Sequence, residues 1–237
     1  MTRWTPFLIG TFFIVILTVG FAMLTARSLK QRRADVPARS WGDPATVLGV
    51  SRRALYLNAT ASQGLLLLIL VVLIGLTGIA FADLGLPGEL SLPLSVAVGV
   101  GFGIVLAGLN HLMQWWLDAI GIDYDDALRA LLTPSTMGDW LILLVIVLPV
   151  VAAFEELLFR GVLIGGLTVG FEVSPWLLAV VSSIIFAAGH GLQGRGGLIA
   201  AGILGLALAV GFVLTESLVV VIIAHYVVNT LEFVRHR

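Results

Sequence analysis

The sequence predicts an all-α protein, a polytopic transmembrane bundle of about seven helices. Of its 237 residues, 59% are hydrophobic and only 11% are charged, whereas soluble globular domains have about 45–50% apolar and about 25% charged residues. Seven apolar stretches have roughly the 17–25 residues that a membrane-spanning helix needs. The net charge of −1 and the lack of a basic face give no indication of nucleic-acid binding, and the absence of cysteine excludes disulfides and thiolate chemistry.

The predicted helices divide the chain into three parts. They run approximately over residues 7–24, 64–81, 94–117, 140–169, 174–190, 198–214 and 218–234. The first is predicted to be retained rather than cleaved as a signal peptide, because the stronger basic cluster follows it and no clear cleavage site is present. We predict N-terminal helices with a basic cytoplasmic loop in residues 1–139, a core with the polar motifs in 140–233, and a basic tail in 234–237.

The basic residues predict how the chain lies in the membrane, because cytoplasmic loops are enriched in Lys and Arg. With the N-terminus outside, eleven of the thirteen basic residues are cytoplasmic, Arg3 is outside and Arg160 lies within the membrane. The eleven are Arg27, Lys30, Arg32, Arg33, Arg39, Arg52, Arg53, Arg129, Arg195, Arg235 and Arg237. We therefore predict a multi-pass protein of the cell membrane with its C-terminus in the cytoplasm.

Three ionisable side chains, Glu155, Glu156 and Arg160, interrupt the apolar run 140–169. A charged side chain in the bilayer centre costs about 2.5–3.5 kcal/mol even on the most lenient scale, so intramembrane charges indicate functional sites. Residues four apart share a face of a helix, whereas neighbours point in different directions. Glu156 is therefore predicted to form a structural ion pair with Arg160, which leaves Glu155 to face the interior of the bundle.

Two later predicted helices carry polar residues at the same spacing, Phe186 with His190 and His225 with Asn229. At 1.5 Å per helical residue, Glu155, His190 and Asn229 lie at depths compatible with one cavity. A buried glutamate with a histidine can activate water, and an asparagine with a second histidine can donate hydrogen bonds to an oxyanion. The pattern predicts an amide hydrolase that uses activated water, with Glu155, His190, His225 and Asn229 as catalytic residues.

These three motifs, in this order, resemble those of the CPBP family, the CAAX proteases and bacteriocin-processing enzymes, also called the Abi or CAAX prenyl endopeptidase family. The resemblance covers about residues 140–233 and includes Phe159-Arg160-Gly161. It implies a glutamate-type intramembrane endopeptidase in which Glu155 and His190 activate water. His225 and Asn229 would hold the oxyanion. The residues in supporting roles would be Glu156, Arg160 and Phe186.

The expected substrate is a membrane-associated peptide or protein. A prenylated C-terminal motif, a leader peptide and a membrane-embedded segment all stay open, as does the oligomeric state. We expect no cofactor, although Glu155, His190 and His225 offer the two-histidine, one-carboxylate set of a catalytic zinc. The H-E-x-x-H motif is absent, and His225 is expected to pair with Asn229, a poor zinc ligand. Metal-free chemistry is therefore preferred, and a zinc-dependent peptidase is the alternative.

Two other classes of function use the same buried residues. A non-catalytic membrane scaffold or immunity protein would keep the motifs for binding, and a proton-coupled transporter would use the buried Glu and His as a proton path. No internal repeat is visible in the sequence, which weakens the transporter hypothesis. Outside the motifs, residues 118–139 are predicted to form a solvated loop, Asn110 and His111 to pack near Trp115, and Gly99 and Gly103 to permit close helix contact.

Overall fold

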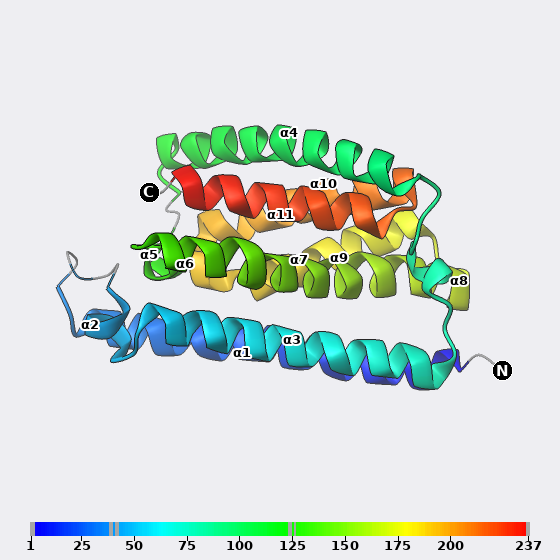
Figure 1. Ribbon diagram of the computed structural model, residues 1–237, viewed down its shortest axis with the longest axis horizontal. Coiled ribbons are helices and arrows are strands. Elements are labelled where there is room, and N and C mark those ends of the chain that lie inside the picture. Colours follow the sequence, from blue (N-terminus) through cyan, green and yellow to red (C-terminus); the bar gives the residue numbers. More distant parts are fainter. Residues whose placement is uncertain (1–2, 38–39, 41–42, 123–124, 126, 236–237) are drawn as a thin grey trace.

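In the computed structural model the chain folds into a bundle of helices that lie side by side (Figure 1). The structure describes residues 3–37, 40, 43–122, 125 and 127–235. Within these residues all regular secondary structure is helical, which confirms the predicted all-α class. Large apolar side chains such as Phe12, Leu68 and Ile104 are exposed on the outer helix faces. An apolar exterior of this extent suits contact with lipid.

Most passes through the bundle are made by long helices. These are α1 (Trp4–Ala34), α3 (Arg52–Thr77), α4 (Leu92–Ala119), α10 (Gly194–Thr215) and α11 (Leu218–Arg235). A continuous helical segment, Met137–Phe171, contains α6 (Met137–Ile142), α7 (Leu148–Glu156) and α8 (Leu167–Phe171), separated by the π-helical stretches η3 (Leu143–Val147) and η4 (Leu157–Gly166). The shorter elements are α2 (Pro44–Leu48), η2 (Phe81–Leu84), α5 (Ala127–Leu132), α9 (Pro175–Gly189) and η5 (Gly191–Gln193).

Six helical segments of the described chain are long and apolar enough to span a membrane, which fits a multi-pass membrane protein. The sequence predicts seven, and the difference is the predicted helix 174–190. It forms α9, which has only 15 residues and is therefore about 22 Å long, shorter than a hydrocarbon core of about 30 Å. Since α9 starts beside α8 at one end of the bundle, its C-terminal end lies inside the bundle (Figure 1).

The two chain ends lie at opposite ends of the bundle, and α2, α5 and α6 lie at the end that holds the C-terminus (Figure 1). This placement gives an odd number of passes when the shorter α9 is counted together with the six long segments. Which end faces the cytoplasm stays a prediction. Arg39 and Arg237, which contribute to that prediction, lie outside the described residues, as does the second half of the tail 234–237.

Helices α4 and α11 approach each other closely because glycines line α4. A Cβ atom on Gly99 would lie 2.7 Å from the carbonyl oxygen of Val220, and one on Gly103 would lie 2.7 Å from that of Ala224. Only glycine permits such an approach of two backbones, so the close contact predicted for Gly99 and Gly103 is confirmed. The contact holds α11, which carries His225 and Asn229, in a defined position.

Candidate active site

A buried ion pair lies where α7 passes into η4. Arg160 Nη1 donates a hydrogen bond to Glu156 Oε1 at 2.8 Å, and neither side chain has any exposed surface. Arg160 Nη2 donates a second hydrogen bond to the carbonyl oxygen of Gly205 in α10, also at 2.8 Å. The predicted pairing of Glu156 with Arg160 is therefore confirmed, and the guanidinium additionally joins η4 to α10.

The segment that carries Arg160 is π-helical from Leu157 to Gly166. A wider turn of this kind interrupts the regular hydrogen bonding of an α-helix and is frequent at functional sites. A side chain of α9 bonds to this stretch, since Ser182 Oγ donates to the carbonyl oxygen of Phe159 at 2.6 Å. The residue spacing predicts regular α-helical geometry throughout this segment, so the π-helical turn is a departure from the prediction.

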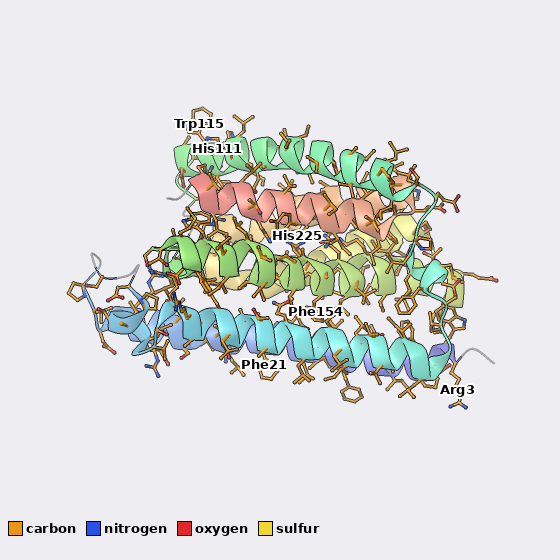
Figure 2. The ribbon with its side chains drawn as sticks, in the orientation of Figure 1. Arg3, Phe21, His111, Trp115, Phe154 and His225 are labelled. Carbon is orange, nitrogen blue, oxygen red and sulfur yellow. The ribbon has the colours of Figure 1, made fainter. Side chains whose placement is uncertain are left out.

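His225 completes a chain of three buried polar side chains. Its Nδ1 lies 2.6 Å from Glu156 Oε1. Because that oxygen already accepts from Arg160, it acts as an acceptor, and His225 Nδ1 must carry the proton. Nε2 of His225 lies 3.7 Å from Glu155 Oε2. His225 thus stands between the two glutamates, about midway along the bundle between α11 and α7 (Figure 2).

This arrangement corrects one expectation. The residue spacing predicts that His225 pairs with Asn229, its neighbour one turn along α11, and that Glu156 pairs with Arg160 alone. In the structure His225 bonds to Glu156 across the interface between α11 and α7, although Asn229 does lie near it on the cavity wall. A contact between residues 69 positions apart depends on how two helices pack, and helical periodicity carries no information about that.

His190 lies at the C-terminal end of α9, with its ring near the ring of Phe186. Its Nδ1 lies 2.9 Å from the carbonyl oxygen of Phe186. A carbonyl oxygen can only accept, so Nδ1 carries the proton and Nε2 of the neutral ring is left as an acceptor. The ring centre of Phe186 lies 4.4 Å from that of His190 and 6.1 Å from that of His225. Phe186 therefore separates and orients the two imidazoles.

The polar residues surround one small cavity of about 60 Å³. A buried water needs roughly 10–15 Å³ of space measured in this way, so a few waters fit. The lining residues are Asn110, Arg129, Phe186, His190, Gln193, Ala200, Ala201, Leu204, His225, Val228, Asn229 and Glu232. The structure thus brings His190, His225 and Asn229 together, as the sequence predicts.

Glu155 lies less close to the cavity than the sequence predicts. It is not among the residues that line the cavity, and its side chain is 13% exposed. Among the described residues, the histidine that Glu155 contacts is His225, and His225 also lines the cavity. Glu155 therefore contacts a residue of the cavity wall without being one of the lining residues.

The residues that form this arrangement match a known family. Residues 137–231 match the family model for type II CAAX prenyl endopeptidases, Rce1-like. We call residues 137–231 the Rce1-like segment. The match runs from the start of α6 into α11 and includes all three polar motifs, so the resemblance to the CAAX protease family is confirmed. No curated protein and no solved structure matches the chain significantly.

The match of the Rce1-like segment supports a CAAX-type intramembrane protease in general, which is a hydrolase. The multi-pass helical fold agrees with that class. The family match does not assign a role to any single residue. The roles of the polar side chains around the cavity are therefore argued from their geometry.

The Rce1-like segment does not present a ready metal site. Among the residues that the structure describes, no three His, Asp or Glu side chains converge so as to hold a metal ion. His225 and His190 each keep Nε2 available, because their Nδ1 atoms bond to Glu156 and to the carbonyl oxygen of Phe186. Among the described residues, however, the alternative zinc set of Glu155, His190 and His225 is not grouped so as to hold a metal ion.

The opposite end of the cavity contains a second polar cluster, which the sequence analysis missed. Its centre is Glu232 on α11, whose side chain is 7% exposed. Asn110 Nδ2 donates to Glu232 Oε1 at 2.9 Å. Arg129 Nη1 and Arg235 Nη2 lie 3.0 Å and 3.3 Å from Glu232 Oε2. We call Asn110, Arg129, Glu232 and Arg235 the Glu232 cluster.

Two expectations change with the Glu232 cluster. The segment predicted as a solvated loop contains α5, and its Arg129 side chain is only 12% exposed and lines the cavity. Asn110 bonds to Glu232 and also lines the cavity, while His111 contacts Arg235. A signal for this cluster was present, because Glu232 is a carboxylate within an apolar helix, and such residues are expected to be paired.

Proposed function

We propose that this chain is an intramembrane endopeptidase that hydrolyses a peptide bond of a membrane-associated protein or peptide. The observation that carries the proposal is that His190, His225 and Asn229, which all belong to the Rce1-like segment, line one small cavity with space for a few waters. Apolar helices surround this cavity, so water reaches the reacting bond only where polar groups hold it. The enzyme is proposed to lie in the cell membrane with its N-terminus outside and its C-terminus in the cytoplasm.

Glu155 and His190 are proposed to activate the water. Glu155 takes a proton from water, and the resulting hydroxide attacks the carbonyl carbon of the peptide bond. The Nε2 lone pair of His190, left available by the bond from Nδ1 to Phe186, helps to hold and move this proton. The proton then passes to the amide nitrogen, and the carbon–nitrogen bond breaks to give a new carboxylate and a new amine. A general base acts directly or through one bridging water, which suits a glutamate next to the cavity.

His225 and Asn229 are proposed to stabilise the oxyanion. Both lie on the wall that α11 contributes to the cavity, and the Asn229 amide is a hydrogen-bond donor. His225 can donate from Nε2 only when the ring carries both protons, because Nδ1–H is bonded to Glu156. The 3.7 Å separation between Nε2 and Glu155 is longer than a hydrogen bond. Nε2 thus keeps the capacity to bond to the substrate oxygen.

Glu156, Arg160 and Phe186 are proposed to be positioning residues. Glu156 holds His225 at Nδ1 and is itself held by Arg160. Phe186 lies 4.8 Å below the Arg160 guanidinium and packs against both imidazoles. This chain of contacts fixes the ring of His225 before substrate arrives, and such preorganisation is what makes oxyanion stabilisation effective.

Cleavage of a quenched fluorescent S-farnesyl peptide by the purified protein in liposomes tests the proposal. Glu155→Gln is expected to lower the rate by about 10²- to 10⁴-fold, the usual contribution of a general base. Asn229→Ala is expected to lower it by about 10²- to 10³-fold, as for loss of an oxyanion donor. Glu172→Gln is the matched control, because Glu172 is exposed at the C-terminal end of α8.

Wild-type cleavage that persists in Glu155→Gln would overturn the proposed mechanism. Substrate-linked proton flux into the liposomes, without any cleaved product, would instead support the transporter. Binding of the peptide without cleavage or flux, unchanged in Glu155→Gln, would support a scaffold. All variants are first compared by size-exclusion chromatography, so that a loss of rate is not a loss of folded protein.

A further inference from the structure

An open apolar groove lies between α9 and α10. Its volume is about 500 Å³, and it is lined by side chains between residues 180 and 188 of α9 and between residues 198 and 206 of α10. We call it the α9–α10 groove. Its base lies at the buried Ala187, where a Cβ atom on Gly202 would be 3.4 Å from the Cβ of Ala187. Ile184 and Ile203 are exposed beside it, so the groove opens toward the surroundings of the bundle.

The lining of the α9–α10 groove suits hydrocarbon. The polar side chain among its lining residues is that of Ser183, and its hydroxyl donates to the carbonyl oxygen of Ala179 at 2.6 Å. A polar ligand would lose its hydrogen bonds to water and gain no donor in return. The volume lies within the roughly 300–1,000 Å³ of ligand-binding pockets. The groove is therefore suited to a single hydrocarbon chain.

A cation lies in line with the groove. Arg195 is the second residue of α10, and α10 begins at the end of the bundle that holds the C-terminus (Figure 1). With 3.6 residues per turn, Arg195 points within about 20° of the mean direction of the α10 residues that line the groove. Its side chain is exposed, and no carboxylate of the described chain pairs with it. The groove thus has a free guanidinium at one end.

The length of the groove distinguishes between possible occupants. Arg195 and Leu206, which lies at the far end of the lining, are about 17 Å apart along the helix axis. A hydrocarbon core is about 30 Å thick, so each leaflet accounts for about half of this distance. A transmembrane helix of a partner would need the full thickness. An acyl chain from one leaflet fits the groove, and its phosphate would then lie at the level of Arg195.

The groove is separated from the candidate active site by α10 itself. The α10 residues that line the catalytic cavity are Ala200, Ala201 and Leu204. In helical projection they face about 180° away from those that line the groove. A hydrocarbon group attached beside the reacting bond of a substrate would have to pass through this helix to reach the groove. The groove therefore suits a membrane lipid better than the substrate's own lipid group.

We propose that the α9–α10 groove binds one acyl chain of an anionic phospholipid whose phosphate contacts Arg195. The lipid belongs to the leaflet at the end of the bundle that holds the C-terminus. This inference goes beyond the proposed peptidase function and does not depend on it. The bound chain would also pack α9 and α10 together, and these helices carry His190 and the Gly205 carbonyl that bonds to Arg160.

Native mass spectrometry of the delipidated protein in detergent tests the charge at Arg195. The protein is titrated with dioleoyl phosphatidylglycerol and with dioleoyl phosphatidylcholine, which share their acyl chains. We expect phosphatidylglycerol to bind about 5-fold more tightly, as for one cation at a membrane surface. Arg195→Gln should bring this ratio close to one, and Arg195→Lys should retain it. Arg27→Gln is the matched control, because Arg27 is an exposed arginine in the C-terminal part of α1.

Photochemical cross-linking tests the groove. A phosphatidylglycerol with a diazirine in its acyl chain is expected to label residues 180–206. Ala188→Phe places a large side chain in the groove and should lower this labelling several-fold. Ala97→Phe is the control, because Ala97 is exposed on α4 outside the groove, and it should leave the labelling unchanged. Size-exclusion chromatography confirms that both variants are folded.

Several results would overturn the inference. Equal affinity for the two lipids, or the same loss of preference in Arg27→Gln as in Arg195→Gln, would remove the role of Arg195. Labelling that Ala188→Phe does not lower would show unselective lipid contact. Displacement of the lipid by an S-farnesyl peptide, but not by the same peptide without farnesyl, would assign the groove to the substrate. A dimer that Ala188→Phe dissociates would assign it to a second copy of the chain.

Both measurements are made without any cleavage reaction. A protein that binds the lipid as expected but cleaves no peptide would retain the lipid site and lose the proposed function. A protein whose cleavage depends on Glu155 but which shows no preference for phosphatidylglycerol would retain the function and lose the lipid site.

Discussion

The buried pair of Glu156 and Arg160 gives a prediction about stability. Glu156→Gln keeps the shape of the side chain and one oxygen acceptor, but removes the charge opposite Arg160. Both side chains are fully buried, so water cannot replace the lost partner. Breaking a buried ion pair from one side typically costs about 3–5 kcal/mol. For a chain of this size each kcal/mol corresponds to roughly 2–4 °C, so we expect the Tm to fall by about 6–20 °C.

The double variant Glu156→Gln/Arg160→Met makes the prediction specific to the pair. The double variant lacks both charges of the pair, so neither is left without its partner, and the oxygen of the new glutamine can still accept a hydrogen bond from His225 Nδ1. We add the losses in free energy of unfolding of the two single variants and compare this sum with the loss in the double variant. We expect the double variant's loss to be smaller than the sum by about 2 kcal/mol or more, within the range of coupling energies for residues in contact. The comparison isolates the charge pair from the general cost of changing two buried residues.

Size-exclusion chromatography of the detergent-solubilised protein after heating measures these Tm values. Arg53→Gln is the control, because Arg53 forms an ion pair with Asp139 but its own side chain is 67% exposed. Because the Arg53 side chain lies largely in solvent and its buried partner Asp139 keeps a hydrogen bond from Ser135, Arg53→Gln should lower the Tm less than Glu156→Gln. Strictly additive single and double variants, or a Glu156→Gln variant as stable as Arg53→Gln, would refute the account of the buried pair.

Two further predictions concern the helix contact at α4 and the chemistry of the site. Gly103→Ala would place a methyl group 2.7 Å from the carbonyl oxygen of Ala224, whereas a Cβ atom on Gly108 in the same helix meets nothing within 4 Å. Gly103→Ala should therefore lower the Tm, and the control Gly108→Ala should not. An equal effect of the two variants would contradict the contact. Because no three potential ligands converge among the described residues, cleavage should survive treatment with 1,10-phenanthroline. Loss of cleavage that zinc restores would reverse that conclusion.

The features predictable from the sequence are those that depend on spacing along one helix. The pair of Glu156 and Arg160 follows from a four-residue interval, and the presence of a close helix contact on α4 follows from the interval between Gly99 and Gly103, although the sequence does not name the partner helix. The all-α class follows from composition and from the length of the apolar stretches. Each of these is a local property that the order of residues already contains.

The features missed depend on packing between helices or on departures from regular helix geometry. The bond between His225 and Glu156 and the contact between Arg129 and Glu232 each join residues far apart in the chain. The π-helical stretch η4 begins directly after Glu156 and changes how the segment turns, so an α-helical projection does not locate its side chains. The bounds predicted for the helix 174–190 agree with α9 to one residue at each end, but its 15 residues are too few for a full span, which the prediction did not take into account.

The rate at which purified Glu155→Gln cleaves the S-farnesyl peptide in ¹⁸O-labelled water tests the central claim most directly. The account predicts that wild-type protein and Glu172→Gln place one labelled oxygen in the new carboxylate, and that folded Glu155→Gln forms this product at least about 100-fold more slowly. Labelled product formed by Glu155→Gln at the wild-type rate would contradict the claim that this carboxylate beside His225 activates the water.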